Sequence, residues 1–320
     1  MSIRLSTFIS ILMLCILSGQ VYAVDSYKYS KIVIGNYNKI TGDIGSNNVN
    51  WTFVKPSHIA IDEIKNIYVL DVVRKRILIF SNTGVISKEI ILSNIDFSDK
   101  SEDLGDDGYI EYQIEVSPTG EYIYLTEGGK ENNWAVIDNK GNILKNNIYI
   151  SGVHRCCDNI LRGSDDRYIL NNMLNIVYKI NISKIDNIQH IVDSENNIYY
   201  ISKNGSTCKN SFLIKTNSSG KQIFTKSIFD CNSTFRFIGV DGKNNLYIVV
   251  DQLRVILKVN KEGIVVNRIK IPVVPFFNGW IKFKVLCDGT IVCIPGYSAL
   301  WNENNGYKID GEYLLYFIEE

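Results

Sequence analysis

The stretch Pro56–Leu92, PSHIAIDEIKNIYVLDVVRKRILIFSNTGVISKEIIL, contains four short runs rich in β-branched and aromatic residues, separated by turn residues. The runs cover 58–61, 66–70, 76–80 and 85–92, which is the length and composition of strands. Gly84 supplies the positive φ that a tight hairpin between the last two runs requires. The stretch therefore predicts one four-stranded antiparallel sheet.

Weaker copies of this stretch recur toward the C-terminus. Asp193–Tyr200 and Asp241–Ile248 match Asp62–Val69 position for position, and Ser117–Tyr124 is a looser copy. A four-strand unit repeated every ~40–50 residues is the signature of propeller blades. The sequence therefore predicts an all-β fold, a six-bladed β-propeller whose four-stranded antiparallel blades lie near 54–93, 109–150, 151–187, 188–231, 234–274 and 279–320, the third being degenerate.

The two ends of the chain predict how the ring closes. The last predicted blade ends after a third strand, Tyr313–Ile318, while Lys31–Gly35 near the N-terminus is a spare strand. Pairing these two segments would cover an otherwise exposed sheet edge. We therefore expect the N-terminal strand to close the ring, with residues 24–320 forming a single domain.

Residues 1–23 are predicted to be a signal peptide. Arg4 provides the positive start, Phe8–Leu17 is the apolar core, and Val21 and Ala23 are small residues at the cleavage-site positions. The apolar core is shorter than the roughly 20 residues of a membrane-spanning helix. We expect a secreted or periplasmic protein with no membrane span after signal removal.

The cysteines fit an exported protein. An even number remains after removal of the predicted signal peptide, which suggests disulfides, although six cysteines allow 15 pairings. Cys208 with Cys231 is the preferred pair because both would flank one sheet. Cys287 with Cys293 could bridge a local turn, although their register in the predicted hairpin does not obviously match. Buried free thiols are the alternative. The six are Cys156, Cys157, Cys208, Cys231, Cys287 and Cys293.

Candidate ligand-binding residues lie on the loop-rich face of the predicted propeller. The connections between second and third strands, and between blades, open on that face and vary in length, as functional loops often do. Trp301 and its neighbouring tyrosines could stack on a sugar or apolar ligand, or the loop that carries them could fold over the channel mouth. The candidates are His58, Trp134, Tyr297, Trp301 and Tyr307.

No metal site is predicted. The loop Asp96–Asp107 has six carboxylates, but its glycine and glutamate positions depart from those of a calcium loop, and a solvated loop is expected. The histidines His58, His154 and His190 have no zinc-ligand spacing, and His154 is expected in a connection. A calcium or zinc cofactor is expected only under the alternative that the protein is an enzyme.

The segment Tyr68–Asp71, followed by Arg76 and Phe80, resembles the NHL repeat, and Asp251 with Arg254 keeps a shortened version of it. The resemblance implies a six-bladed β-propeller. It implies little about function, because relatives include scaffolds, lyases and lactonases. The aspartate that ends Tyr68–Asp71 is expected to pair with Arg76.

The leading functional hypothesis is a non-enzymatic, monomeric binding protein for a protein, peptide or glycan. The 34 basic and 34 acidic residues balance, so the basic surface typical of nucleic-acid binders is missing. The sequence has no nucleophile elbow and no phosphate-binding loop. The alternative is a metal-dependent lactonase- or lyase-like enzyme with its site at the mouth of the central channel.

Overall fold

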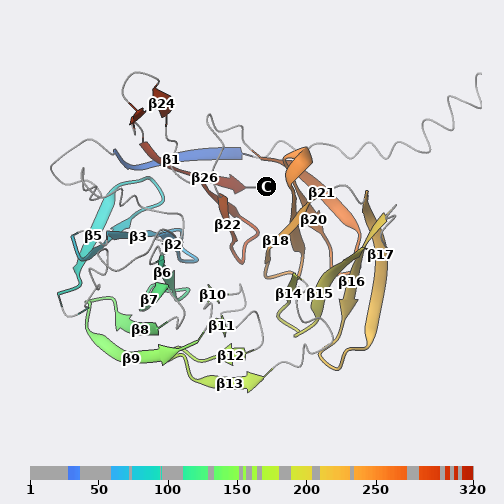
Figure 1. Cartoon of the computed structure of the whole chain (residues 1–320), viewed down its shortest axis with the longest axis horizontal. Coiled ribbons are helices and arrows are strands. Elements are labelled where there is room, and N and C mark those ends of the chain that lie inside the picture. The colour runs from blue at the N-terminus through green and yellow to red at the C-terminus, as the bar shows by residue number, and fades with distance from the viewer. Residues whose placement is uncertain are drawn as a thin grey trace, which may run out of the picture.

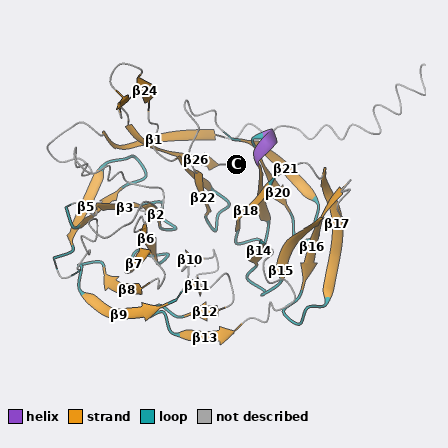
Figure 2. Cartoon of the chain, viewed as in Figure 1, coloured by secondary structure: helices purple, strands orange, loops and turns teal. Residues whose placement is uncertain are grey.

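In the structure, a computed structural model, most of the described residues lie in strands (Figure 2). Among the described residues the helical element is η4 (Asp251–Leu253), a single turn, and no helix there is long and apolar enough to cross a membrane. The predicted signal peptide lies outside the described residues. These residues are 28–36, 59–71, 74–93, 95, 111–128, 133–150, 154–155, 161–163, 168–179, 189–203, 210–230, 234–271, 281–295, 300–302, 306–308 and 312–319.

The first three of the four-stranded antiparallel sheets follow one another along the chain. Sheet 1 contains β2 (Ile59–Ile61), β3 (Ile67–Asp71), β4 (Arg76–Phe80) and β5 (Ile86–Ile91). Sheet 2 contains β6 (Glu111–Val116), β7 (Tyr122–Gly128), β8 (Asn133–Asp138) and β9 (Ile143–Tyr149). Sheet 3 contains β10 (His154–Arg155), β11 (Leu161–Gly163), β12 (Tyr168–Leu170) and β13 (Ile176–Lys179).

Three further four-stranded sheets complete the described set. Sheet 4 contains β14 (His190–Val192), β15 (Ile198–Lys203), β16 (Asn210–Thr216) and β17 (Gln222–Asp230). Sheet 5 contains β18 (Phe235–Val240), β19 (Leu246–Val250), β20 (Val255–Val259) and β21 (Val265–Lys270). Sheet 6 contains β22 (Ile281–Val285), β23 (Ile291–Pro295), β26 (Glu312–Glu319) and β1 (Lys28–Asn36).

The sheets follow one another in chain order around a common centre (Figure 1). The first strand of each sheet lies nearest this centre and is called the inner strand here. The inner strands are β2, β6, β10, β14, β18 and β22, and the fourth strands lie farthest out. The four-stranded units along the chain were predicted from the repeats, and the all-β class is confirmed.

Sheet 6 is assembled from both ends of the chain. Strand β1 pairs antiparallel with β26, so that Lys31 faces Tyr316 and Val33 faces Leu314. The order β1–β26–β23–β22 makes β1 the fourth strand of this sheet. The predicted pairing of the spare N-terminal strand with the last strand is therefore confirmed.

The turn after the inner strand explains the repeated Asp–Asn–Tyr pattern. In sheet 1, Asp62 Oδ1 accepts hydrogen bonds from the backbone N–H groups of Ile64 and Asn66, at 3.1 and 2.8 Å. Its Oδ2 accepts from Asn66 Nδ2 at 2.9 Å and from Tyr68 Oη at 3.1 Å. One carboxylate thus shapes the turn and satisfies a buried phenol. Sheets 4 and 5 repeat the set with Asp193, Asn197 and Tyr199, and with Asp241, Asn245 and Tyr247.

Burial affects the protonation of both Tyr68 and Asp62. Burial, followed by the negative charge of Asp62, raises the pKa of Tyr68, so the phenol stays a hydrogen-bond donor. Burial also raises the pKa of Asp62, against the opposing effect of its four hydrogen bonds. At the other end of β3, Asp71 Oδ2 lies 3.0 Å from Arg76 Nε, which confirms the predicted ion pair.

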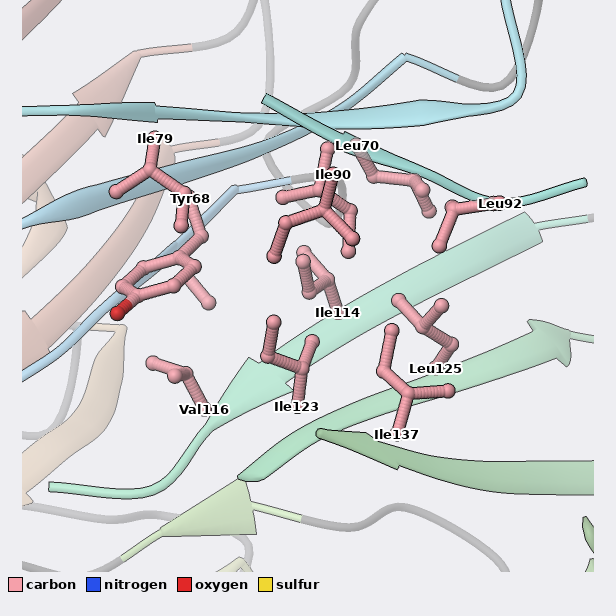
Figure 3. Packing of buried hydrophobic residues seen from close by; sticks show 12 residues of the cluster. Tyr68, Leu70, Ile79, Ile90, Leu92, Ile114, Val116, Ile123, Leu125 and Ile137 are labelled. Carbon is pink, nitrogen blue, oxygen red and sulfur yellow. The ribbon is translucent and has the colours of Figure 1, made fainter. Parts of the chain in front are cut away.

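A hydrophobic cluster lies at each boundary between neighbouring sheets. Figure 3 shows the one between sheets 1 and 2, where Leu70 and Ile90 point toward Ile114 and Ile123. Ile59 of sheet 1 shares a cluster with residues of sheet 6. Strands packed on both faces in this way carry near-continuous apolar runs. Members from facing sheets at the other boundaries include Trp134 and Leu170, Ile169 and Val192, Leu213 and Leu257, and Val249 and Ile291.

The turns that follow the inner strands also contact one another, and we call them the turn belt. Between sheets 4 and 5, Ser194 Oγ donates to Asn244 Oδ1 at 2.7 Å. Between sheets 5 and 6, the N–H of Gly242 donates to the carbonyl of Cys287 at 3.0 Å. The turns of the belt are 62–66, 117–122, 193–197, 241–245 and 286–290.

The turn belt continues from sheet 6 to sheets 1 and 2. The N–H of Cys287 donates to Glu63 Oε2 at 2.9 Å, and Lys65 Nζ lies 3.4 Å from Asp288 Oδ2. The N–H of Glu63 donates to the carbonyl of Pro118 at 3.1 Å. The turns of sheets 4, 5, 6, 1 and 2 therefore lie on one face of the molecule, in a continuous series of contacts.

Candidate binding face

The face opposite the turn belt carries the starts of the inner strands. Because neighbouring strands within each sheet are antiparallel, the connection from the second to the third strand lies at the same end as the start of the first. Connections between successive sheets end there too. We call this end the loop-rich face, since its connections differ in length.

One connection on the loop-rich face is much longer than its counterparts. Sheet 6 uses 296–311 between its second and third strands and builds a separate two-stranded hairpin there. This hairpin consists of β24 (Leu300–Asn302) and β25 (Gly306–Lys308), and β24 lies outside the four-stranded sheet (Figure 1). The corresponding connections in sheets 1 to 5 cover 72–75, 129–132, 164–167, 204–209 and 251–254.

The hairpin brings two of the predicted binding residues together. Trp301 faces Tyr307 in the antiparallel ladder, flanked by Leu300 opposite Lys308. Directly opposed residues share one face of a hairpin, and their neighbours lie on the other face. The backbone register therefore sets the two aromatic residues directly opposite each other. Tyr297 lies outside the described residues.

Trp134 does not belong to the binding face. Its side chain is 1% exposed in the core between sheets 2 and 3, and its indole N–H donates to the carbonyl of Ile150 at 2.8 Å. The expectation that Trp134 is presented on the loop-rich face is corrected by this burial. The missed signal is its spacing from Val136, because residues two apart in a strand share a face.

The predicted bridge between Cys287 and Cys293 is wrong, since the structure has no disulfide between these two residues. Cys293 pairs with Phe283 in the ladder of sheet 6, whereas Cys287 lies four residues beyond Phe283, inside the turn. The two sulfur atoms therefore do not meet across the hairpin. Burial raises the pKa of Cys293 to about 12. The other predicted pair, Cys208 and Cys231, lies outside the described residues.

The inner strands carry a buried ion pair that the sequence did not predict. Glu115 of β6 and Lys284 of β22 lie 2.5 Å apart, Oε1 to Nζ, with side chains only 8% and 10% exposed. Lys282 of the same strand donates through Nζ to the carbonyl of Ile59 on β2, at 3.2 Å. The only sequence signal is the alternation in Ile281–Val285, IKFKV, which is also typical of a strand with one solvated face.

A second charged pair lies near the start of β18. Arg236 donates to Asp251 through Nη2 at 2.8 Å and through Nε at 3.2 Å. Its guanidinium carbon also lies 5.9 Å from the ring centre of Phe283 on β22. Such a bidentate pair fixes the planar guanidinium between sheets 5 and 6. Asp251, noted in the sequence beside Arg254, thus binds Arg236.

Two of the three histidines begin inner strands. His154 is the first residue of β10 and His190 the first residue of β14. His154 thus lies in a strand, which corrects the expectation that it sits in a connection. His58 precedes β2 and lies outside the described residues, as does the acidic loop Asp96–Asp107. Within the described part of the chain, no group of three or more His, Cys, Asp or Glu side chains could hold a metal ion.

Comparisons with known proteins show that this chain is similar to them in structure only. The sequence matches no protein-family model and no curated protein. Similar solved structures include three β-propeller proteins. Virginiamycin B lyase from Staphylococcus aureus shares 12% identity over 92% of this chain and 100% of that one, with a TM-score of 0.45. BamB from Moraxella catarrhalis shares 10% identity, covering 92% and 100%, with a TM-score of 0.43. The PQQ-bound aldose sugar dehydrogenase from Streptomyces coelicolor shares 10% identity, covering 91% and 98%, with a TM-score of 0.43.

Proposed function

We propose that this chain is an exported, monomeric six-bladed β-propeller that binds a protein, peptide or glycan on its loop-rich face. A closed ring is supported by the cluster shared by sheets 6 and 1, by the contacts along the turn belt, and by the pairing of β1 with β26. A propeller holds variable loops on a rigid scaffold, and such loops are where binding residues concentrate. An NHL-like origin of the repeats remains part of this proposal.

The observation that carries the proposal is the β24–β25 hairpin. It occupies a connection several times longer than its counterparts, and it sets Trp301 opposite Tyr307. An isolated two-stranded hairpin is marginally stable in water, so a hairpin of this kind is stabilised by what contacts it. Aromatic residues offer a large contact area together with a polar edge, which suits a glycan ring or a peptide side chain.

The experiment is a binding screen of the purified protein against a glycan array and a panel of synthetic peptides. We expect a ligand whose binding is lost in the variant Trp301→Ala with Tyr307→Ala. The matched control is Ile264→Ala, which removes a 54% exposed apolar side chain from a turn on the opposite face. Unchanged binding by the double variant would overturn the assignment of the hairpin as the binding site.

The alternative function is a metal-dependent lactonase- or lyase-like enzyme with calcium or zinc at the channel mouth. Glu115 favours it, because this carboxylate lies on an inner strand. The Lys284 ammonium at 2.5 Å works against it, since a cation beside the carboxylate repels a second one. Metal analysis of the purified protein separates the two proposals: stoichiometric calcium or zinc would overturn the non-enzymatic one.

A further inference from the structure

The pair Glu115–Lys284 joins two sheets that are not neighbours. Glu115 belongs to sheet 2 and Lys284 to sheet 6, and sheet 1 lies between them in the order of sheets. Their side chains must therefore meet in front of the inner strand of sheet 1. Both are nearly fully buried, so the space in front of that strand is filled.

The register explains how the two side chains meet. Ala60 of sheet 1 lies one residue before the last paired residue of its inner strand, and Glu115 and Lys284 occupy the same position in theirs. The three residues therefore lie at one level of neighbouring inner strands. Ala60 has only a methyl side chain and is 2% exposed. This methyl group packs in the cluster between sheets 1 and 2.

Lys282, two residues before Lys284 on β22, is a second lysine that extends from sheet 6 toward sheet 1. Residues two apart in a strand lie on the same face, so Lys282 and Lys284 both extend from the face of β22 that meets sheet 1. Lys282 reaches the carbonyl of Ile59, the neighbour of Ala60. Lys282 of sheet 6 thus reaches sheet 1, and Lys284 extends past it to sheet 2.

We propose that Glu115 and Lys284 close the centre of the ring at the level of Ala60. This inference rests on the proposed ring of six sheets, and it sharpens the proposed function: a ligand reaches the centre from the loop-rich face and does not pass through. Two charges removed from water are tolerated when paired and costly when one is left alone. The two side chains therefore close the centre of the ring by filling it and by holding their opposite charges together.

A charge swap tests the pairing. Glu115→Lys and Lys284→Glu each place like charges together in a buried site, and we expect each to raise the unfolding equilibrium constant about 100-fold or more. The double variant restores opposite charges and is expected to return to within about tenfold of the wild type. A double variant as unstable as the sum of the single changes would overturn the pairing.

Alanine variants supply a second test of the pair. We expect Glu115→Ala and Lys284→Ala each to destabilise the protein more than the double variant does, because each single change leaves one buried charge alone. Lys282→Ala is the matched control, since it removes a lysine from the same face of β22 and leaves the pair intact. Effects of the two single changes that add in the double variant would overturn the proposal. These variants also serve if the charge-swap singles do not fold.

Closure itself is read out by hydrogen exchange of the inner strands. In Glu115→Ala with Lys284→Ala, we expect faster exchange of β2, β6 and β22 than in the wild type, with the outer strands unchanged. Unchanged exchange in β2 would show that the pair does not close the centre. Loss of ligand binding in the hairpin variant is a separate result, so the two proposals fail independently.

Discussion

Gly120 in the turn belt offers a test of how tightly neighbouring sheets fit. Its φ is +70°, and a Cβ added there would lie 1.9 Å from Tyr68 Oη of sheet 1. Gly120→Ala is therefore expected to destabilise the protein through two separate effects. One is the left-handed backbone, which costs a residue with a Cβ about 1–2 kcal/mol. The other is overlap with the phenol, at about 1–3 kcal/mol for an overpacked site.

A second substitution separates these two effects. Tyr68→Phe alone removes the hydrogen bond to the Asp62 carboxylate, which costs about 1.5–3 kcal/mol. It also removes the atom that the new Cβ would meet at 1.9 Å, leaving Tyr68 Cζ at 3.1 Å and Asp62 Oδ2 at 3.3 Å as the nearest neighbours. In the double variant with Gly120→Ala, the backbone cost remains and most of the overlap disappears.

The expected result is a favourable coupling. The double variant should be more stable than the sum of the single changes by about 1–3 kcal/mol, measured by urea unfolding followed by circular dichroism. Gly289→Ala is the graded control, because its φ is +91° but its added Cβ would lie 3.0 Å from Tyr247 Oη. Additivity within about 0.5 kcal/mol would refute the close fit of Gly120 against Tyr68.

Two further predictions concern sheet 6. Iodoacetamide at pH 8 should label Cys287 and spare the buried Cys293. The thiol of Cys293 stays protonated because burial raises its pKa to about 12. Labelling of Cys293 in the native protein, detected by mass spectrometry, would contradict its burial. Burial raises the pKa of Asp288, but hydrogen bonds from Thr290 and the nearby Lys65 ammonium lower it more, so the net shift is downward. Its contribution to stability is therefore present above about pH 4 and lost as the pH falls. Asp288→Asn should lower the free energy of unfolding, measured in urea, by less than about 1 kcal/mol at pH 7 and leave it unchanged near pH 2. Equal losses at both pH values would contradict this linkage.

Local chemistry made the sheets predictable from the sequence. Asp62, Asn66 and Tyr68 recur at fixed spacing in sheets 4 and 5 because one carboxylate satisfies a turn and a phenol together. Gly84 marks the outer hairpin for a similar reason, since its φ is +81°. Hydrogen bonds and backbone angles within a single turn constrain residues that are close in the sequence, so they produce patterns that can be recognised from the sequence.

Contacts between sheets were not predictable in the same way. Glu115 and Lys284 are 169 residues apart, and nothing in either strand identifies the other. Trp134 was misplaced because a tryptophan near a strand end is compatible with a loop-facing site and with a core. What decides between them is Leu170 of the next sheet, whose position depends on how the sheets are arranged.

The binding face was predictable in outline only. The length of the 296–311 connection identifies an insertion, and the presence of Trp301 and Tyr307 is plain in the sequence. Their alignment opposite each other is set by the turn between them. For Cys287 and Cys293 the spacing already indicated a mismatch in register across the predicted hairpin, and the β22–β23 ladder pairs Cys293 with Phe283.

The pairing of β1 with β26 has a consequence for biosynthesis. Chains generally fold domain by domain as they are made, but contacts between distant segments must wait until both exist. Sheets 1 to 5 are each built from consecutive strands, so each can form once its own segment has been synthesised. Sheet 6 cannot, because β1 is made before all the others and β26 after them. Throughout synthesis β1 remains an unpaired strand, which makes it the segment on which a chaperone would act and the one most exposed to mispairing.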